Sequence, residues 1–208
     1  MGAVVVDLSM SLDGFVTGPN PRAGLPLGEG GERLHEWMFG GRAGSDQASG
    51  EGAASDVNGA MVRELFATTG AVLMGRRIFD MGLEPWGDTP FPVPCFVLTH
   101  QAHEDVVMAS GTFTFITDGL AAALDRARAA AAGKNVLAHS PDIAQQLLRA
   151  DLLDEISLHL APVLLGGGRR LFEHLGEGRR DLQLAGVTQA PGVTHLRYHL
   201  ASRRAADV

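Results

Sequence analysis

The sequence predicts an α/β protein with a mixed, mostly parallel central sheet, flanking helices and an antiparallel hairpin near the C-terminus. Three observations favour this class. Continuous apolar runs rich in β-branched residues recur along the first 140 residues, and stretches with helical signals lie between them. After residue 153 the pattern changes to an alternation of apolar and polar residues, which is typical of strands with one face in solvent.

The continuous runs define the expected buried strands. The first is AVVVDLS at 3–9, and four later runs resemble it: 71–75, 93–99, 112–117 and 135–139. Strands of this kind belong to a sheet that is covered on both faces.

Three helices are expected between these strands. The first spans 55–70, with Ser55 or Asp56 as N-cap and Gly70 at its end; the second spans 118–133, with Asp118 as N-cap and Gly133 at its end. The third begins at Ser140-Pro141. These helices would cover the sheet.

The C-terminal part reads as antiparallel and partly exposed. In 154–165 the alternation places Ile156, Leu158 and Leu160 on one face and Ser157 and His159 on the other. We interpret three polar residues of the later strand at 193–200 as a row of side chains that face solvent: His195, Arg197 and His199. The same interpretation fits His159. His195 and His199 cannot share a metal ion, because four residues of strand span roughly 13 Å, and no metal site is expected.

Residues 18–54 are rich in Gly, Pro and acidic side chains, and so long a loop is typical of a lid or binding loop. It contains one short amphipathic patch, ERLHEWMFGG. Trp37 in this patch either stacks on a planar substrate or anchors the patch to the core. The tail at 202–208 is expected to be frayed.

Composition limits the function classes. The chain has 208 residues, of which 45% are hydrophobic, so a single domain over 1–201 is expected. A net charge of -7 without a basic cluster argues against nucleic acid, and no apolar run approaches the roughly 20 residues of a membrane span. One cysteine, Cys95, and no apparent leader segment favour a cytoplasmic protein.

Two segments have residues suited to binding or catalysis. Asp13, in SMSLDGFVTGPN, lies among apolar neighbours, which would raise its pKa and make it a proton donor; alternatively Asp13-Gly14 is only a turn. Gly75, Arg76 and Arg77 end a strand and begin a helix. Two guanidinium groups beside free N–H groups suit a phosphate, and the alternative is a pair of solvated arginines.

Two further segments are weaker signals by themselves. Thr99, His100 and Gln101 follow a strand, at the edge where open α/β sheets bind ligands. APVLLGGG at 161–168 ends an apolar strand in three glycines, which allow either a close backbone approach or a tight loop.

In this order the four segments resemble the dihydrofolate-reductase-like superfamily, in the branch related to the reductase domain of riboflavin biosynthesis. The resemblance rests on SLDGFVTGP, VLMGRRIFD, FVLTH and LLDEISLHLAPVLLGGGRRLF, and it spans about residues 4–200. It implies the α/β fold described above, NADPH as cofactor and a homodimer.

The resemblance also implies roles for individual residues. Val16, Thr17 and Gly18 would contact the nicotinamide side, and Asp13 would lie near the substrate. Gly75, Arg76 and Arg77 match the clamp for the adenosine phosphate, with Thr99 and His100 beside it. Leu165 and Gly166 would border the substrate cleft.

One junction departs from the family pattern. Where relatives carry a Gly-Gly pair beneath the cofactor pyrophosphate, this chain has His139-Ser140 followed by Pro141. The added side chains narrow the approach, and Pro141 removes one N–H donor at little cost to the helix. Ser140 still offers a hydroxyl, and a protonated His139 could pair with phosphate and make binding pH-dependent.

The favoured function is an NADPH-dependent reductase that transfers hydride to a C=N or C=O group of a small heterocyclic or sugar-like substrate. The alternative is a non-catalytic ligand-binding protein of the same fold with a degenerate cofactor site. The His139-Ser140-Pro141 junction motivates the alternative.

Overall fold

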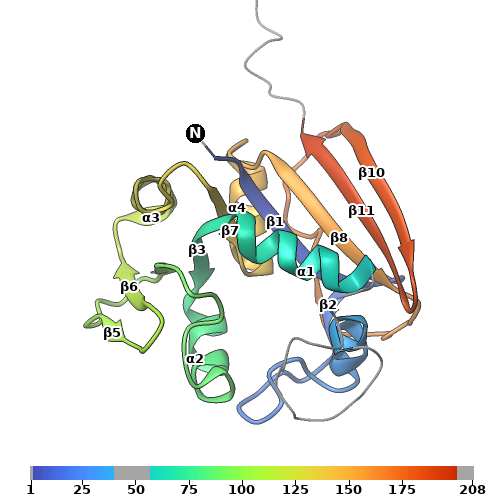
Figure 1. The fold of residues 1–208 in the computed structure, drawn as a ribbon, viewed down its shortest axis with the longest axis horizontal. Coiled ribbons are helices and arrows are strands. Elements are labelled where there is room, and N and C mark those ends of the chain that lie inside the picture. The colour runs from blue at the N-terminus through green and yellow to red at the C-terminus, as the bar shows by residue number, and fades with distance from the viewer. Residues whose placement is uncertain (1, 40–56, 201–208) are drawn as a thin grey trace, which may run out of the picture.

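A computed structural model describes residues 2–39 and 57–200. Within them, nine strands form one sheet in the order β10-β11-β8-β1-β7-β3-β4-β6-β5 (Figure 1). The strands of this sheet are β1 (Val4–Ser11), β3 (Thr69–Gly75), β4 (Cys95–Leu98), β5 (Val106–Val107), β6 (Thr112–Ile116), β7 (Asn135–Ala138), β8 (Glu155–Ala161), β10 (Leu182–Ala190) and β11 (Val193–Leu200). A second small sheet pairs β2 (Phe15–Thr17) with β9 (Arg169–Arg170).

The sheet is mixed and mostly parallel, as expected. The pairs β8·β1, β1·β7, β7·β3, β3·β4 and β4·β6 are parallel, and antiparallel pairing occurs only at the two described edges, in β5·β6 and in β8·β11·β10. One expectation is wrong in part: β8 pairs antiparallel with β11, but it is parallel to β1 and is buried along most of its length. The antiparallel part therefore begins with β11, one strand later than its alternation indicated.

Helices cover both faces of the sheet. On one face lie α1 (Val57–Thr68) and α2 (Arg76–Trp86), and on the other lie α3 (Gly119–Ala130) and α4 (Pro141–Arg149) (Figure 1). Two 3-10 helices, η1 (Gly31–Leu34) and η2 (Glu36–Phe39), lie near the start of α1.

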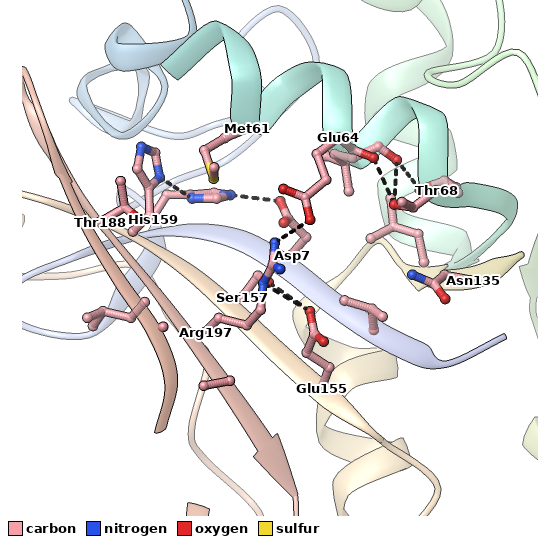
Figure 2. Close-up of a pocket in the computed structure, with 18 residues that line it drawn as sticks. Asp7, Met61, Glu64, Thr68, Asn135, Glu155, Ser157, His159, Thr188 and Arg197 are labelled. Atoms are coloured by element: carbon pink, nitrogen blue, oxygen red, sulfur yellow. Dashed lines mark hydrogen bonds and ion pairs between the residues drawn. The ribbon is translucent and has the colours of Figure 1, made fainter. Parts of the chain in front are cut away.

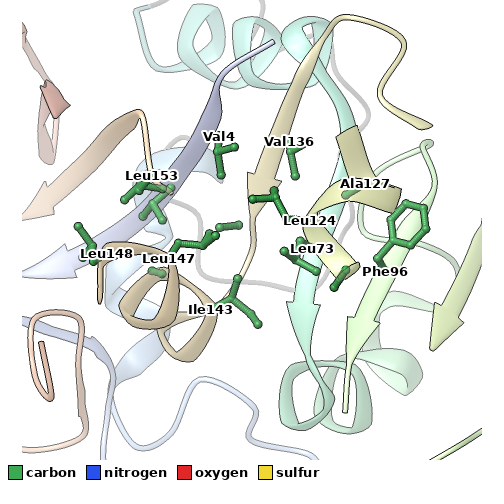
Figure 3. Packing of buried hydrophobic residues seen from close by; sticks show 14 of the residues in the cluster. Val4, Leu73, Phe96, Leu124, Ala127, Val136, Ile143, Leu147, Leu148 and Leu153 are labelled. Carbon is green, nitrogen blue, oxygen red and sulfur yellow. The ribbon is translucent and has the colours of Figure 1, made fainter. Parts of the chain in front are cut away.

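The larger core lies between the sheet and the helices α3 and α4 (Figure 3). It contains Val4 of β1, Val136 of β7 and Leu73 of β3, packed against helical residues such as Leu124, Ala127, Ile143 and Leu147. Because successive strand residues point to opposite faces, β1 turns Val4 and Val6 into this core and Asp7 and Ser9 toward the other face. The face beneath α1 is therefore polar along β1.

Several boundaries differ from expectation or lie outside the described residues. Gly70 does not end a helix; α1 passes directly into β3, and Gly70 lies so close to Ala131 that a Cβ would come within 2.4 Å of the Ala131 carbonyl oxygen. The proposed caps Ser55 and Asp56, residues 40–54 of the expected lid and the tail at 202–208 fall outside the described residues. Over the described part of the chain, every helix is too short or too polar to cross a membrane.

Candidate functional site

The carboxyl ends of the parallel strands bring three of the expected segments together. Gly75 of β3 pairs with Leu98 of β4, and Leu73 pairs with Ala138 of β7. Thr99, Gly75 and Ser140 consequently follow three neighbouring strands at the same edge of the sheet, where open α/β sheets bind ligands.

Ser140 joins the starts of two helices. It is the N-cap of α4, where its Oγ accepts a hydrogen bond from the Ile143 N–H at 3.3 Å, and the same Oγ accepts from the Gly75 N–H at 3.3 Å. Gly75 is itself the N-cap of α2. Two helix N-termini thus converge on one hydroxyl whose own proton has no recorded acceptor among the described residues, an arrangement that favours an anion.

Arg76 and Arg77, which follow Gly75, differ in how available their guanidinium groups are to a ligand. Arg76 donates from Nε to Asp80 at 2.7 Å, and its guanidinium lies over the rings of Phe115 and Phe79 at 5.7 and 5.9 Å. Arg77 is exposed and forms no ion pair within the described residues. The Arg77 guanidinium is therefore available to bind a phosphate, whereas Arg76 would have to break its ion pair with Asp80 or bind the phosphate and Asp80 together.

His139 is not a cationic phosphate ligand near neutral pH. Its ring lies 5.6 Å from that of Phe91 and 6.0 Å from that of Trp86, and burial lowers its pKa to about 4. The imidazole is therefore uncharged at pH 7, and the expected pairing of a protonated His139 with phosphate is corrected by this apolar packing.

Asp13 accepts hydrogen bonds as a carboxylate, in contrast to the neutral acid with a raised pKa that its sequence neighbours predicted. Its Oδ1 accepts from the Ser11 hydroxyl at 2.6 Å and from the Leu165 N–H at 3.1 Å, and its Oδ2 accepts from the Gly166 N–H at 2.8 Å. These bonds, that of Ser11 first, lower its pKa from 3.8 to about 2. The carboxylate stays ionised because its neighbours are hydrogen-bond donors rather than the apolar residues adjacent in sequence.

The same bonds connect two expected site segments. The Asp13 carboxylate connects the loop after β1 to the glycine turn, because it accepts hydrogen bonds from Leu165 and Gly166. Gly166 adopts a positive φ of 69° in this turn. Next to it, Gly168 lies against Thr17, where a Cβ would meet the Thr17 carbonyl oxygen at 1.9 Å. Val16, Thr17 and Gly18 are buried behind this contact, while Thr99 is buried and His100 is exposed.

Trp37 anchors η2 to the sheet. Its side chain is 6% exposed, and its Nε1 donates to Ser9 Oγ at 2.9 Å. Its ring also packs against His159 and His195, at centroid distances of 4.5 and 5.0 Å. Of the two interpretations offered above, the core anchor is confirmed, since this packing leaves no open ring face for a planar substrate.

His159 and His195 are not exposed, which corrects the solvent-facing row. They are 6% and 5% exposed, and they form a chain of hydrogen bonds across the face beneath α1. The chain runs from Asp7 Oδ1 to His159 Nε2 at 2.9 Å, from His159 Nδ1 to His195 Nδ1 at 2.7 Å, and from His195 Nε2 to Asn58 Oδ1 at 3.0 Å. Burial, and then the neighbouring His159, lower the pKa of His195 to about 4, against the opposing effect of Asp7.

This chain borders a cavity of about 300 Å³ between α1 and the sheet (Figure 2). Asp7, His159 and His195 form one side of it, and apolar residues such as Val5, Met61 and Leu137 also line it. Arg197 lies in register with Ser157 and Asp7 on the same face of the sheet, where it bonds to Glu64 of α1 at 2.9 Å and lies 3.4 Å from Glu155 of β8. Charged, polar and apolar groups thus converge on a space that suits a small ligand.

Sequence reasoning missed this second region because alternation alone does not reveal whether a polar face is covered. A signal was present in β1, where Asp7, Ser9 and Ser11 interrupt an otherwise apolar strand at every second position. Polar residues on one face of a central strand indicate a covered polar surface, since a strand in the middle of an α/β sheet has no solvent face.

The fold and the carboxyl-edge site define an α/β protein of the dihydrofolate-reductase-like class. More narrowly, the chain belongs to the RibD C-terminal domain family, whose model matches residues 3–196. The resemblance noted in the sequence is thereby confirmed.

Solved structures agree at the level of the fold. A protein from Shewanella sp. PV-4 that is named for riboflavin biosynthesis has 22% identity and a TM-score of 0.67, covering 96% of this chain and 99% of that one. A pyrimidine reductase-like protein from Corynebacterium diphtheriae has 14% identity and a TM-score of 0.59, with 96% and 92% covered.

A Thermotoga maritima deaminase/reductase has 10% identity and a TM-score of 0.63. This chain is covered over 96% and that one over 57%, and its name gives the reductase substrate as 5-amino-6-(5-phosphoribosylamino)uracil. No curated protein sequence matches the chain significantly.

Proposed function

We propose that this protein is an NADPH-dependent reductase that transfers hydride to a C=N or C=O group of a small heterocyclic or sugar-like substrate. The observation that carries the proposal is the convergence of the α2 and α4 N-termini on Ser140, beside Arg76 and Arg77. Family membership supports it, because the relatives with named activities are reductases.

The residues present fit the cofactor. The Ser140 hydroxyl and the N–H groups of two helix starts suit a pyrophosphate, and an exposed Arg77 suits the additional phosphate that distinguishes NADPH from NADH. The cofactor supplies the hydride, so the tasks of this chain are to bind it, orient it and exclude water. Gly75 lacks a side chain where the phosphate has to approach the backbone.

The cavity beneath α1 is the proposed substrate chamber. Its mixture of carboxylates, imidazoles, Arg197 and apolar residues suits a polar, flat molecule with several hydrogen-bonding groups. The relative from Thermotoga maritima provides the first compound to test, 5-amino-6-(5-phosphoribosylamino)uracil. The glycine turn with Leu165 and Gly166, which was expected to border the substrate, does not line this cavity, and Asp13 holds that turn in place as a carboxylate. A homodimer remains a prediction.

The test is NADPH affinity, measured by calorimetry, in a variant that combines Arg76→Ala and Arg77→Ala. Loss of charge-assisted phosphate bonds worth about 1.5–3 kcal/mol should weaken binding by roughly ten- to a hundredfold. Arg179→Ala, which removes an exposed arginine paired with Asp181, is the matched control and should bind NADPH normally. Wild-type protein that binds no NADPH would favour the alternative, a non-catalytic ligand-binding protein.

A further inference from the structure

The hydrogen-bond chain beneath α1 links four elements. Asp7 belongs to β1, His159 to β8, His195 to β11 and Asn58 to α1. The Trp37 side chain of η2 packs against both imidazole rings and covers this part of the hydrogen-bond chain. Buried polar groups that are all hydrogen-bonded in this way fix one arrangement of the elements that contribute them.

The orientation of Asn58 follows from its other partner. Its Nδ2 donates to the Pro191 carbonyl oxygen at 3.3 Å, and a carbonyl can only accept. The Asn58 Oδ1 therefore faces His195 and accepts, so His195 Nε2 has to carry a proton.

The hydrogen bonds of this chain require more ring protons than two neutral histidines carry. His159 Nε2 donates to the Asp7 carboxylate, His195 Nε2 donates to Asn58, and one proton has to lie between the two Nδ1 atoms, which are 2.7 Å apart. Three N–H protons are required on four ring nitrogens, whereas two neutral imidazoles supply only two. The chain with every hydrogen bond made therefore carries one extra proton, whose charge lies opposite Asp7. Because burial lowers the pKa of His195 to about 4, this protonated state is the minor one near neutral pH, and its population grows as pH falls.

The extra proton on the imidazole pair is acidic. Burial lowers the pKa of His195, so the protonated state gives up its proton readily. The charged groups that face the pair are Asp7 on β1, Glu64 on α1, Glu155 on β8 and Arg197 on β11. His35, between η1 and η2, also lies near His159, but it is itself uncharged near neutral pH because burial lowers its pKa to about 4.

A reductase of this kind needs a proton for the substrate, and Asp13 is held as a carboxylate by its hydrogen bonds. We propose that the pair formed by His159 and His195 stores the proton that joins the substrate beside the hydride, and that Asp7 delivers it. This inference rests on the proposed function. Asp7 is the carboxylate end of the chain; it lines the cavity together with His159 and His195, and its Oδ2 has no hydrogen-bond partner among the described residues.

A bound dihydronicotinamide would supply the hydride that forms the new C–H bond at the substrate carbon and would itself be left oxidised, and the π electron pair of the C=N or C=O bond would move onto the heteroatom. Asp7 starts as a carboxylate, so a proton passes first from His159 Nε2 to Asp7 and then from Asp7 to the heteroatom. Asp7 is then a carboxylate again, and the imidazole pair is left with two protons and is refilled from water.

Two measurements test the inference. In the first, NADPH oxidation with 5-amino-6-(5-phosphoribosylamino)uracil is followed from pH 5 to 8 in the wild type, His195→Gln and His199→Gln. Wild-type kcat should rise as pH falls, by up to about tenfold per unit, and His195→Gln should lower kcat by roughly 10²- to 10⁴-fold with little change in the KM for NADPH. His199 lies on the same strand with an exposed side chain, so His199→Gln should behave as wild type.

The second measurement needs no turnover. Nitrogen-15 NMR of labelled histidines from pH 4 to 8 should show His159 and His195 titrating as one unit, from two to three ring protons as pH falls. His195→Gln should abolish the joint titration, and His199→Gln should preserve it. Two neutral rings over the whole range, or wild-type kcat in a folded His195→Gln, would overturn the inference. Failure of the wild type to bind NADPH would instead reject the proposed function, while NMR still decides whether the pair stores a proton.

Discussion

Asp13 shows how a side chain's role depends on neighbours that are distant in the chain. The adjacent residues Leu12, Phe15 and Val16 predicted an acid with a raised pKa, but the side chain bonds instead to Ser11 and to the backbone of a turn about 150 residues away. Hydrogen bonds to the charged form dominate over burial. A sequence window does not contain that turn, so the sign of the pKa shift could not be predicted from it.

The lowered pKa of Asp13 predicts a particular pH dependence of stability. Because the folded-state pKa lies near 2, below the ordinary 3.8, the carboxylate stabilises the fold fully above about pH 4 and loses this effect as pH falls toward 2. Asp13→Asn should lower the melting temperature by a constant amount between pH 5 and 8. The difference between wild type and variant should shrink below pH 4, and a difference that grew there would contradict the assignment.

His159 and His195 illustrate a second limit of sequence reasoning. The alternation correctly separated Ser157 and His159 from Ile156, Leu158 and Leu160, but it could not show that α1 and η2 cover the polar side. Burial of a polar face is decided by a helix and a short 3-10 segment that come from elsewhere in the chain. The fold class was accessible from local patterns, and the cavity was not.

Among the secondary-structure elements, α4 begins at the junction of residues 139–141, where Ser140 is its N-cap. Ser140 caps α4 and also accepts from Gly75, so the hydroxyl uses its oxygen for protein contacts and keeps its proton for a ligand. The side chains at this junction therefore leave the helix end a donor group. Pro141 at the first helical position is tolerated there.

Ser140→Ala should consequently lower the stability of the protein. Loss of an N-cap typically costs about 0.5–2 kcal/mol, and the buried Ser140, 1% exposed, also loses its bond from Gly75. Urea unfolding measures the change. Asp118→Ala is the internal comparison, because Asp118 occupies the N-cap position of α3 without a side-chain cap bond and should cost less. Equal losses in both variants would show that the link through Ser140 contributes nothing.

The nine-stranded sheet unites both functional regions in one molecule. We propose that residues 1–201 form a single domain around it. The carboxyl edge carries the proposed cofactor site, and the polar face of β1, β8 and β11 carries the cavity, to which β1 contributes Asp7. The mostly parallel direction of the strands was predictable because buried β-branched runs separated by helices favour parallel crossovers. The order of the strands in the sheet was not predicted.

Thermal unfolding with NADPH, with NADH and without ligand tests the proposed function most directly. At about 100 times its dissociation constant, a ligand that binds only the folded state stabilises it by about 2.7 kcal/mol, which for a chain of this size corresponds to roughly 5–11 °C. We predict a shift of this order for NADPH and a smaller one for NADH at equal concentration. Since His139 is neutral above about pH 5, the NADPH shift should not grow between pH 8 and 5.5. No shift with NADPH at any of these pH values would contradict the proposed cofactor site and with it the reductase.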